Sequence, residues 1–559
     1  MLNHDLARVD DRDPETRRRQ TRNPFSPVIM VLTILATIGV VAYSLFLLNP
    51  ANRGDWLPYV LVITAESILI VHAVLAMWTI LAGWRSPRTD EYYLARRELF
   101  GDRLPTSADP ARPDWPLALD GRPISVAVLI TCYGEPLEVI RRTAIAARDL
   151  WGQHTTWILD DGRSDAVRAM AAEVGVQYIR RLSSGGAKAG NVNHALSQVK
   201  TDYFAIFDAD FVPRPEFLYQ TIPFFIDTNV AFVQTPQSYG NMNNLVSRGA
   251  GYMQAVFYRF VQPGRNHFNA AFCVGTNVVF RRAAVDDVGG IYTDSKSEDV
   301  WTSLMLHERG WRTVYIPDVL ATGDAPETIE DYTKQQLRWA TGGFEILFTH
   351  NPFSPRHKLT MDQRLMYFVT ATHYLTGVAP GILLLVPALE IFFDLRPVVL
   401  GTTFATWLLF YAGFYLMQII LAFYTLGSFR WEVLILATSS FPIYIQAFIN
   451  AFSGKEQKWH VTGGAARRTS AFNFIRPQVY LFTFLLLTSV VAVWRDLDNQ
   501  QLSLATAWNI TNTVALGLFL VEAFKEGHRA RVAERAGTRA ASPVPVAPTP
   551  APALQGGLS

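Results

Sequence analysis

Two hydrophobic patterns divide this chain of 559 residues. Near the N-terminus and in the C-terminal part, apolar runs reach about 20 residues, the length that crosses a bilayer as a helix. Between residues 83 and 362 the apolar runs are short and alternate with amphipathic stretches, a pattern typical of an α/β domain. The sequence therefore predicts an α/β domain inserted in an α-helical multi-pass membrane domain, with the lipid bilayer as a partner.

Six segments are predicted to span the membrane: 27–48, 57–81, 371–393, 398–426, 478–494 and 504–524. The first has no small-residue cleavage pattern, so we expect it to remain as an anchor. Arginines precede the first span and follow the second: Arg17, Arg18, Arg19, Arg22, Arg85, Arg88, Arg96 and Arg97. Because basic residues mark cytoplasmic flanks, the α/β domain is expected on the cytoplasmic side of the cell (plasma) membrane.

Segment 432–452 is also apolar, but it contains Pro442 and the pair Ser439-Ser440. Counting it as a span would place the following basic residues outside: Lys455, Lys458, Arg467, Arg468 and Arg476. That placement opposes the usual distribution of positive charge. We interpret the segment as an interfacial or re-entrant helix, which leaves six spans and both chain ends inside. Seven spans are the alternative.

These patterns divide the chain into seven parts. The predicted parts are a basic cytosolic tail (1–26), two transmembrane helices (27–83), the cytosolic domain (84–363), two further transmembrane helices with the interfacial helix (364–452), a basic loop (453–477), two last transmembrane helices (478–524) and a cytosolic tail (525–559). The last tail is basic and then rich in Pro and Ala, which predicts disorder.

The composition of the chain argues against several classes of partner and site. The formal net charge of +2 gives no reason to expect a nucleic-acid partner. The two cysteines, Cys132 and Cys273, do not predict a disulfide framework or a zinc site. The eleven histidines form no metal-binding spacing, and His194, His267 and His307 are interpreted as packing or surface residues.

Within the α/β domain, segments 125–130, 156–159 and 203–207 are predicted to be buried parallel strands, and 137–150, 164–174 and 191–199 helices. Ligands bind such sheets at the carboxyl ends of the strands. Polar clusters follow each predicted strand there: Tyr133-Gly134-Glu135, Asp160-Asp161-Gly162 and Asp208-Ala209-Asp210.

Asp208 and Asp210 are the most informative of these residues. Alternate residues of an extended chain share a face, so both carboxylates can point to one site. Such a pair suits Mg²⁺ or Mn²⁺, which in turn binds phosphate oxygens. Taken alone, the pair is also explained as a turn that ends a strand.

The glycine-rich segment 185–190 has neither the P-loop nor the dinucleotide-binding spacing. It could still bind a diphosphate through Lys188 and the backbone donors of a helix beginning near Asn191. A glycine turn followed by an asparagine cap is the simpler alternative.

Two further helices carry candidate chemistry. Asp299, in Ser297-Glu298-Asp299, opens a helical pattern and is a candidate general base, although capping alone would also explain it. Gln335, Arg338 and Trp339 stand at i, i+3 and i+4 and so share one helix face. That face suits pairing of Arg338 with a pyrophosphate and stacking of a sugar on Trp339. An interfacial helix with an aromatic anchor is the alternative.

In this order the motifs, ending in Gln335-Gln336-Leu337-Arg338-Trp339, resemble those of the processive family 2 glycosyltransferases, most closely bacterial cellulose synthase catalytic subunits. The resemblance covers roughly residues 84–480. It implies a GT-A fold, a UDP-sugar donor (UDP-glucose by default), Mg²⁺ or Mn²⁺, and a growing β-linked polysaccharide that leaves through a channel formed by the chain. A periplasmic or cell-surface accessory protein is a further implied partner.

The resemblance also implies residue roles. Asp299 would be the base, and Asp208 and Asp210 would bind donor and metal. Uridine would lie against Tyr133, Glu135, Asp160 and Asp161, and the diphosphate against Lys188 and Arg338. The acceptor would lie against Cys273, Gln335 and Trp339. Lys458 to Thr462 would form a gating loop over the donor, with Thr462 near phosphate.

Some positions depart from the family pattern. Cys132 and Gly134 replace the usual Thr and Asn around Tyr133, Ser297 replaces a Thr, and Gly464 stands where the gating loop has Lys. No PilZ pattern follows residue 524, so that regulatory domain is not expected. A non-processive transferase acting on a lipid and an inactive nucleotide-binding export partner are the rival functions. The sugar and the linkage stay open.

Overall fold

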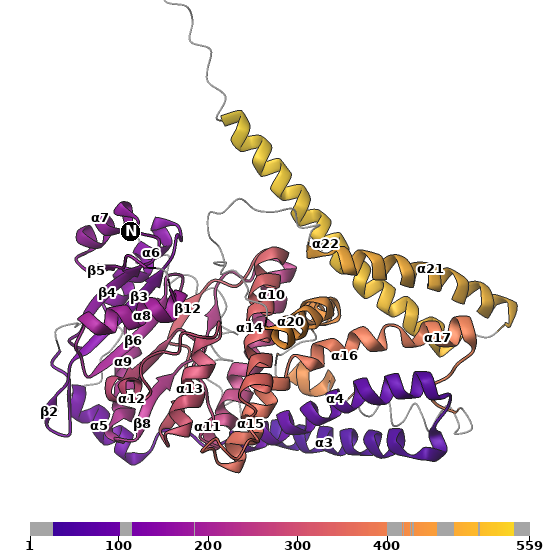
Figure 1. Cartoon of the computed structure of the whole chain (residues 1–559), viewed down its shortest axis with the longest axis horizontal. Coiled ribbons are helices and arrows are strands. Elements are labelled where there is room, and N and C mark those ends of the chain that lie inside the picture. The colour runs from indigo at the N-terminus through magenta and orange to yellow at the C-terminus, as the bar shows by residue number, and fades with distance from the viewer. Residues whose placement is uncertain are drawn as a thin grey trace, which may run out of the picture.

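The computed structural model describes residues 26–100, 115–183, 185–399, 416, 419–424, 426, 430–454, 474–500 and 503–540. An α/β unit occupies one end of the molecule, and long apolar helices extend from its other side (Figure 1). This arrangement confirms the predicted fold class, an α/β domain inserted among helices of a membrane type.

Seven strands form the main sheet in the order β11-β8-β10-β6-β3-β4-β5. Their bounds are β3 Val126–Cys132, β4 Thr155–Asp160, β5 Gln177–Arg180, β6 Tyr203–Asp208, β8 Val230–Gln234, β10 Val278–Arg281 and β11 Arg312–Tyr315. Strand β3 pairs in parallel with β4 and β6, as the sequence predicted. Strand β10 runs antiparallel between β6 and β8, so the sheet is mixed.

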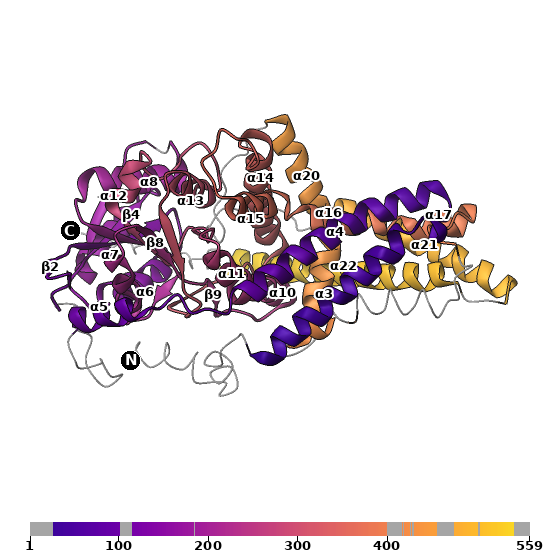
Figure 2. The same cartoon turned by 90° about the horizontal axis from the view of Figure 1, so that it is seen from below.

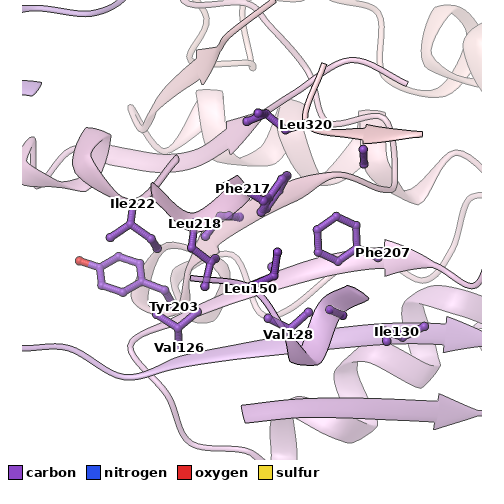
Figure 3. Close-up of a cluster of buried hydrophobic side chains, with 14 of the residues drawn as sticks. Val126, Val128, Ile130, Leu150, Tyr203, Phe207, Phe217, Leu218, Ile222 and Leu320 are labelled. Atoms are coloured by element: carbon purple, nitrogen blue, oxygen red, sulfur yellow. The ribbon is translucent and has the colours of Figure 1, made fainter. Parts of the chain in front are cut away.

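Helices cover both faces of the sheet. They are α5 Asp90–Phe100, α6 Leu137–Arg148, α7 Asp165–Val174, α8 Ala187–Gln198, α9 Phe217–Thr221, α12 Arg282–Asp287 and α13 Glu298–Glu308. Alternate residues of β3 explain the two layers, because successive side chains point to opposite faces. Val128 and Ile130 join the core under α6 and α7 (Figure 3), whereas Leu129 joins the core under α8. Each such buried side chain contributes about 1.5–3 kcal/mol.

Several shorter elements complete the part of the chain that the structure describes. A two-stranded sheet pairs β1 (Ala118–Leu119) with β2 (Arg122–Pro123), and the 3₁₀ helices η1 and η2 cover Pro50–Asn52 and Ile222–Ile226. Helix α10 (Leu245–Val256) continues through the π-helical turn η3 (Phe257–Val261) into α11 (Gln262–His267). Helix α11 contacts both α4 and β11, so it joins the sheet to the helices beyond it.

The remaining helices form the apolar half. Their bounds are α3 Pro27–Leu48, α4 Trp56–Ala82, α14 Ile329–Thr349, α15 Met361–Thr372, α16 Leu375–Leu383, α17 Val386–Phe393, α19 Trp431–Ser439, α20 Phe441–Ser453, α21 Arg476–Asp498 and α22 Leu504–Ala540. Figure 2 shows α3 beside α4 and α21 beside α22, and both pairs are in contact.

Five of the described helical segments are long and apolar enough to cross a membrane, and six if the bent pair α19 and α20 counts as one span. The five correspond to predicted spans 27–48, 57–81, 371–393, 478–494 and 504–524. Predicted span 398–426 lies mostly outside the described residues. Helices α19 and α20 meet at Ser440 with a bend of 43°, at the serine pair that made a straight span implausible.

Two differences from the prediction concern the start of α8 and the end of the chain. Helix α8 begins at Ala187, not near Asn191, with Gly186 in the left-handed conformation before it. Helix α22 continues to Ala540, so residues 525–540 are helical where we expected disorder. That stretch is rich in Ala, Glu and Arg, which favour helix, and it extends a helix that is already nucleated. The tails 1–25 and 541–559 and the loop residues 455–473 lie outside the described residues.

Candidate active site

A cavity of about 590 Å³ lies at the carboxyl ends of β3 and β6, where the sequence placed the site. Ten of the predicted residues line it: Tyr133, Glu135, Asp161, Lys188, Asp208, Asp210, Asp299, Gln335, Arg338 and Trp339. These residues come from segments separated by up to 206 positions in the chain. The fold therefore brings most of the predicted set to a single cavity.

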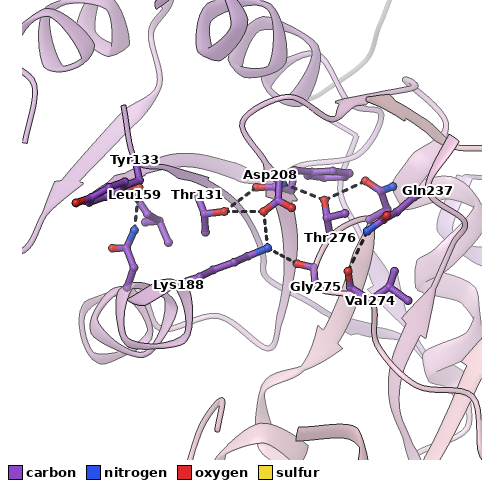
Figure 4. Close-up of polar contacts among 12 residues, drawn as sticks. Thr131, Tyr133, Leu159, Lys188, Asp208, Gln237, Val274, Gly275 and Thr276 are labelled. Carbon is purple, nitrogen blue, oxygen red and sulfur yellow. Dashed lines mark hydrogen bonds and ion pairs between the residues drawn. The ribbon is translucent and has the colours of Figure 1, made fainter. Parts of the chain in front are cut away.

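Asp208, the last residue of β6, is the centre of a hydrogen-bond network (Figure 4). Its carboxylate accepts a hydrogen bond from Thr131 Oγ1 at 3.1 Å and pairs with the ammonium of Lys188. Lys188 Nζ also donates to Gly275 O at 2.7 Å, and the Asp208 backbone N–H donates to Thr276 Oγ1 at 2.9 Å. Burial lowers the pKa of Lys188, but the charges of Asp208 and Glu298 outweigh it and shift it upward. The lysine is therefore a fixed cation at this end of the cavity.

Lys188 reaches the cavity from the first turn of α8, and a buried ion pair holds that turn. Arg181 donates to both carboxylate oxygens of Asp161 at 2.5 and 2.7 Å, and to the backbone oxygens of Gly185 and Ala187 at 2.6 Å each. Bidentate pairing fixes both the position and the orientation of the guanidinium. Asp161 therefore links the end of β4 to the start of α8.

Asp210 belongs to a second group of carboxylates, which are buried close together and repel one another. Burial and the charges of Asp208 and Asp324 raise the pKa of Asp210 to about 8. A small sheet explains why these residues meet: β7 (Val212–Pro213) follows Asp210 and pairs with β12 (Ala321–Gly323), which precedes Asp324. Strand β9 (Ser238–Tyr239) pairs with the other edge of β12 and adds Tyr239 to the cavity wall.

This donor set fits a hard divalent cation. Such ions prefer carboxylate oxygens, and Asp208 and Asp210 supply them from one end of one strand. The mutual repulsion that raises the pKa of Asp210 is the electrostatic condition that a bound cation would relieve. Glu135, whose pKa is raised by burial, lies close enough to contribute to the same negative potential.

The opposite wall begins with Asp299, the second residue of α13. Burial raises the pKa of Asp299, against the effect of Lys188 and Arg338, and burial together with the charge of Asp299 raises the pKa of Glu298 to about 7. Gly275 makes this arrangement possible, because a Cβ there would lie 3.3 Å from Asp299 Oδ2 and 3.4 Å from Lys188 Nζ. Its φ of +84° also favours glycine. The side chains of Asp299 and Lys188 thus both approach the backbone of Gly275.

Helix α14 completes that wall. Gln335, Arg338 and Trp339 line the cavity, whereas Tyr332, Ala340 and Phe344 belong to an apolar cluster with Tyr444 and Ala447 of α20. Helix α14 also contacts the start of α13 closely, since a Cβ on Gly342 would overlap the side chain of Ser297. The position of Arg338 relative to Asp299 therefore depends on helix packing rather than on strand register.

Three predicted residues do not line the described cavity. Asp160 is buried and accepts hydrogen bonds from Arg163 N, Ser164 N and Tyr178 Oη, so it shapes the turn before α7. Cys273 lines a small second cavity together with Asp299, and its backbone N–H donates to Ser303 Oγ at 2.8 Å. Thr462 lies outside the described residues.

The sequence reading gave no role to several cavity residues. Asp324, Tyr239, Lys296 and Glu298 line the wall, and of these only Glu298 belongs to a motif described above. The strands that position Asp324 and Tyr239 have three and two residues, too short for a periodic signal. Glu298 could have been predicted from the sequence, because it is the direct neighbour of the predicted base Asp299.

A mixed sheet that ends in a carboxylate pair is faced here by an acidic helix start and a cationic helix, the arrangement expected of a GT-A-like glycosyltransferase domain. Two known families match parts of the chain that include these residues. Residues 123–342 match the family described as glycosyltransferase like family 2, and residues 285–463 match the family described as cellulose synthase. The predicted resemblance to processive family 2 glycosyltransferases is therefore confirmed.

Individual relatives point the same way. The chain is 39% identical over 263 residues to the UDP-forming cellulose synthase catalytic subunit of Xanthomonas axonopodis pv. citri, covering 45% of this chain and 36% of that one. It is 36% identical over 296 residues to putative cellulose synthase 2 of Komagataeibacter xylinus, and this match covers 50% of this chain and 19% of that one. The matched segment thus spans only a fifth to about a third of these relatives.

Among solved structures, a mannosyltransferase from Pyrobaculum calidifontis in complex with GDP-mannose and Mn²⁺ aligns with 70% of this chain and 100% of its own. The TM-score is 0.44 and the identity 16%. A likeness at this level adds no argument about the chemistry of the present chain.

Proposed function

We propose that the protein is a membrane-embedded inverting glycosyltransferase that polymerises a β-linked polysaccharide from a UDP-sugar. The favoured product is a cellulose-like β-glucan. One observation carries this proposal. A single cavity joins the carboxylate pair of β6 to Asp299 and to the face of α14 with Arg338 and Trp339, and α14 also packs on the apolar helix α20. The transfer site therefore adjoins the helices through which a polymer would leave.

The donor would bind at the sheet end of the cavity. Tyr133, Glu135, Asp160 and Asp161 belong to the uridine end by resemblance, and Asp161 and Asp160 support it through the turns they hold. Asp208 and Asp210 would hold Mg²⁺ or Mn²⁺, which supplies positive charge to the departing diphosphate. Lys188 and Arg338 add cationic charge to the same group. UDP-glucose is the proposed donor.

Asp299 would act as the general base. Its carboxylate removes the proton of the acceptor hydroxyl, the oxygen attacks the anomeric carbon, and the bond from that carbon to the diphosphate oxygen breaks. UDP leaves, and the configuration is inverted in one step without a covalent intermediate. Gln335 and Trp339 would hold the acceptor sugar, with Trp339 offering a ring face for stacking. Cys273 would support this acceptor side, and Thr462 would approach the diphosphate from the gating loop.

The remaining parts of the proposal concern the setting. The catalytic domain would face the cytoplasm and the helices would lie in the cell membrane, as the basic flanks indicate. The growing polysaccharide would be the acceptor, and an accessory protein on the far side of the membrane would receive it.

The test uses the full chain purified in lipid nanodiscs with Mg²⁺ or Mn²⁺ and a panel of radiolabelled UDP- and GDP-sugars. We expect UDP release from UDP-glucose and a filterable product that endo-β-1,4-glucanase digests, with neither from the Asp299→Asn control. A single sugar on a lipid would instead identify the non-processive enzyme. No nucleotide release from any donor would identify an inactive binding partner.

A further inference from the structure

Away from the cavity, three potential metal ligands meet on segments that the sequence gives no reason to connect. Glu308 is the last residue of α13, His350 caps the end of α14, and His357 lies in the loop before α15. His350 Nε2 lies 2.7 Å and His357 Nδ1 2.9 Å from the same oxygen, Glu308 Oε1. Their three donor atoms lie within 4.8 Å of one another, the only such group among the described residues.

We propose that Glu308, His350 and His357 form a second metal site that binds a first-row transition ion, with Zn²⁺ as the expected occupant. Two imidazole nitrogens and one carboxylate oxygen are a donor set that suits zinc and its neighbours rather than Mg²⁺ or Ca²⁺, which prefer oxygen ligands alone. The site is distinct from the Asp208 and Asp210 pair, because Glu308 stands nine residues after Asp299 and about 14 Å further along α13.

The distances suit a site that closes on an ion. Zinc bonds to nitrogen and oxygen of about 2.0–2.1 Å in a tetrahedral arrangement separate neighbouring donors by about 3.3 Å. The donors of Glu308 and the two histidines are now 2.7 and 2.9 Å apart. A shift of roughly half an ångström would therefore admit the ion, which side-chain rotation alone can supply.

The ligands are also held in place. Arg364 of α15 donates to Pro352 O at 2.6 Å, to Ser354 O at 2.7 Å and to His357 O, and so fixes the loop that carries His357. The ring of His350 contacts the edge of Trp301, with centroids 5.3 Å apart, and the two imidazoles have centroids 3.7 Å apart with their planes tilted by 30°. Metal sites require this kind of support for their ligands.

Access to the site is open. The side chains of His350 and Glu308 are 21% and 22% exposed and that of His357 is 17% exposed. An ion can therefore enter from solvent, and water can complete its coordination.

Such an ion would connect α13 and α14, the two helices that form the cavity wall opposite the sheet. It would do so at their C-terminal ends, away from the cavity. Helix α13 begins with Glu298 and Asp299, and α14 carries Gln335, Arg338 and Trp339. Binding to the folded chain alone would raise the thermal stability of this helix pair in proportion to the logarithm of the ion concentration. The role we infer is therefore structural support, and it does not depend on the identity of the sugar.

The test is a binding titration of the chelator-stripped full chain in nanodiscs, purified with a tag that contains no histidine. Excess Mg²⁺ is present throughout the titration, so that Zn²⁺ does not bind at Asp208 and Asp210. We expect one equivalent of Zn²⁺ per chain in competition with a chromophoric chelator, and a Kd at least about 100-fold weaker for His350→Ala and His357→Ala. His194→Ala, which removes a histidine from α8, is the matched control and should bind as the unaltered chain does.

Two further measurements decide the case if a variant does not fold. X-ray absorption of the unaltered, Zn²⁺-loaded chain should show two imidazoles and an oxygen ligand at about 2.0–2.1 Å, and Glu308→Gln provides a conservative third variant with weakened binding. The proposal is overturned if the unaltered chain binds no Zn²⁺ under excess Mg²⁺. It is equally overturned if Asp210→Asn abolishes the binding while His350→Ala and His357→Ala leave it unchanged.

Discussion

The two walls of the cavity are built by different means. On the sheet wall, Asp208 follows directly from the pairing of β6 with β3, and Lys188 is fixed by hydrogen bonds to Asp208 and Gly275. On the helix wall, Asp299 and Arg338 are positioned by contact of α13 with α14, and α14 in turn packs on α20 in the apolar half. Strand register sets the first wall and helix packing the second.

This difference matches the two roles proposed for the walls. A wall fixed by backbone pairing keeps its geometry when neighbouring helices move, which suits the donor and metal binding proposed for it. A wall formed by packed helices can change with the membrane half to which it is attached. Donor binding should therefore survive changes in the helix packing, whereas transfer should not. The following predictions test that separation.

The largest effect is expected from Asp299→Asn. The amide keeps the shape of the side chain but cannot accept the proton, so turnover should fall on the order of 100- to 10,000-fold. Binding of UDP should stay within about twofold. Turnover is measured as UDP release and binding by calorimetry. Near-normal turnover would remove Asp299 from the role of base.

The sheet wall is tested by Asp210→Ala. Losing one carboxylate of the pair should weaken Mn²⁺-dependent binding of UDP by roughly 100-fold, because a ligand contributes at least as much as the groups that support it. Binding is measured with and without EDTA. Glu173→Gln on the surface of α7, where the pair with Arg141 is exposed, is the control. Full activity of the unaltered chain in excess EDTA would contradict the metal assignment.

Packing of the helix wall is tested by Gly342→Ala. The added methyl group overlaps Ser297, and relief of that overlap should cost about 1–3 kcal/mol and move α14 away from Asp299. We expect turnover to fall while binding of UDP with Mn²⁺ is retained. Gly527→Ala, at an open helical position of α22, should change neither.

The double variant Gly342→Ala with Ser297→Gly makes this prediction specific. Removing the serine side chain removes the overlap, so part of the lost turnover should return. If the double variant is as slow as Gly342→Ala alone, the contact between α13 and α14 does not control transfer.

The smallest effect concerns pH. Burial and Asp299 raise the pKa of Glu298 to about 7, so below pH 7 the pair gains a proton and the base is partly blocked. Turnover should therefore fall by roughly two- to fivefold below pH 7 and level off above it. Glu298→Gln removes the negative charge beside Asp299, which lowers the pKa of Asp299. The fall in turnover at acidic pH should therefore begin at a lower pH in this variant. An unmoved limb would show that Glu298 does not influence the base.

The sequence determined the parts of the molecule that local pattern controls. Runs of β-branched and aromatic residues predicted β3, β4 and β6, and because parallel strands end at one edge, they also predicted that Glu135, Asp161 and Asp208 would meet. The lengths of the apolar runs predicted five of the spans that the structure describes. The pattern did not predict the start of α8 or the extension of α22, since helix ends depend on capping and propensity residue by residue.

Only the tertiary structure decided which distant segments share a surface. Asp324 and Tyr239 reach the cavity through strands of three and two residues, which have no periodicity to detect. Glu308, His350 and His357 are separated by up to 49 positions and follow no metal-binding spacing, so no pattern in the sequence predicts that they meet. Their convergence results from the packing of α13, α14 and α15, because contacts between helices depend on the whole arrangement of apolar faces and not on any one segment.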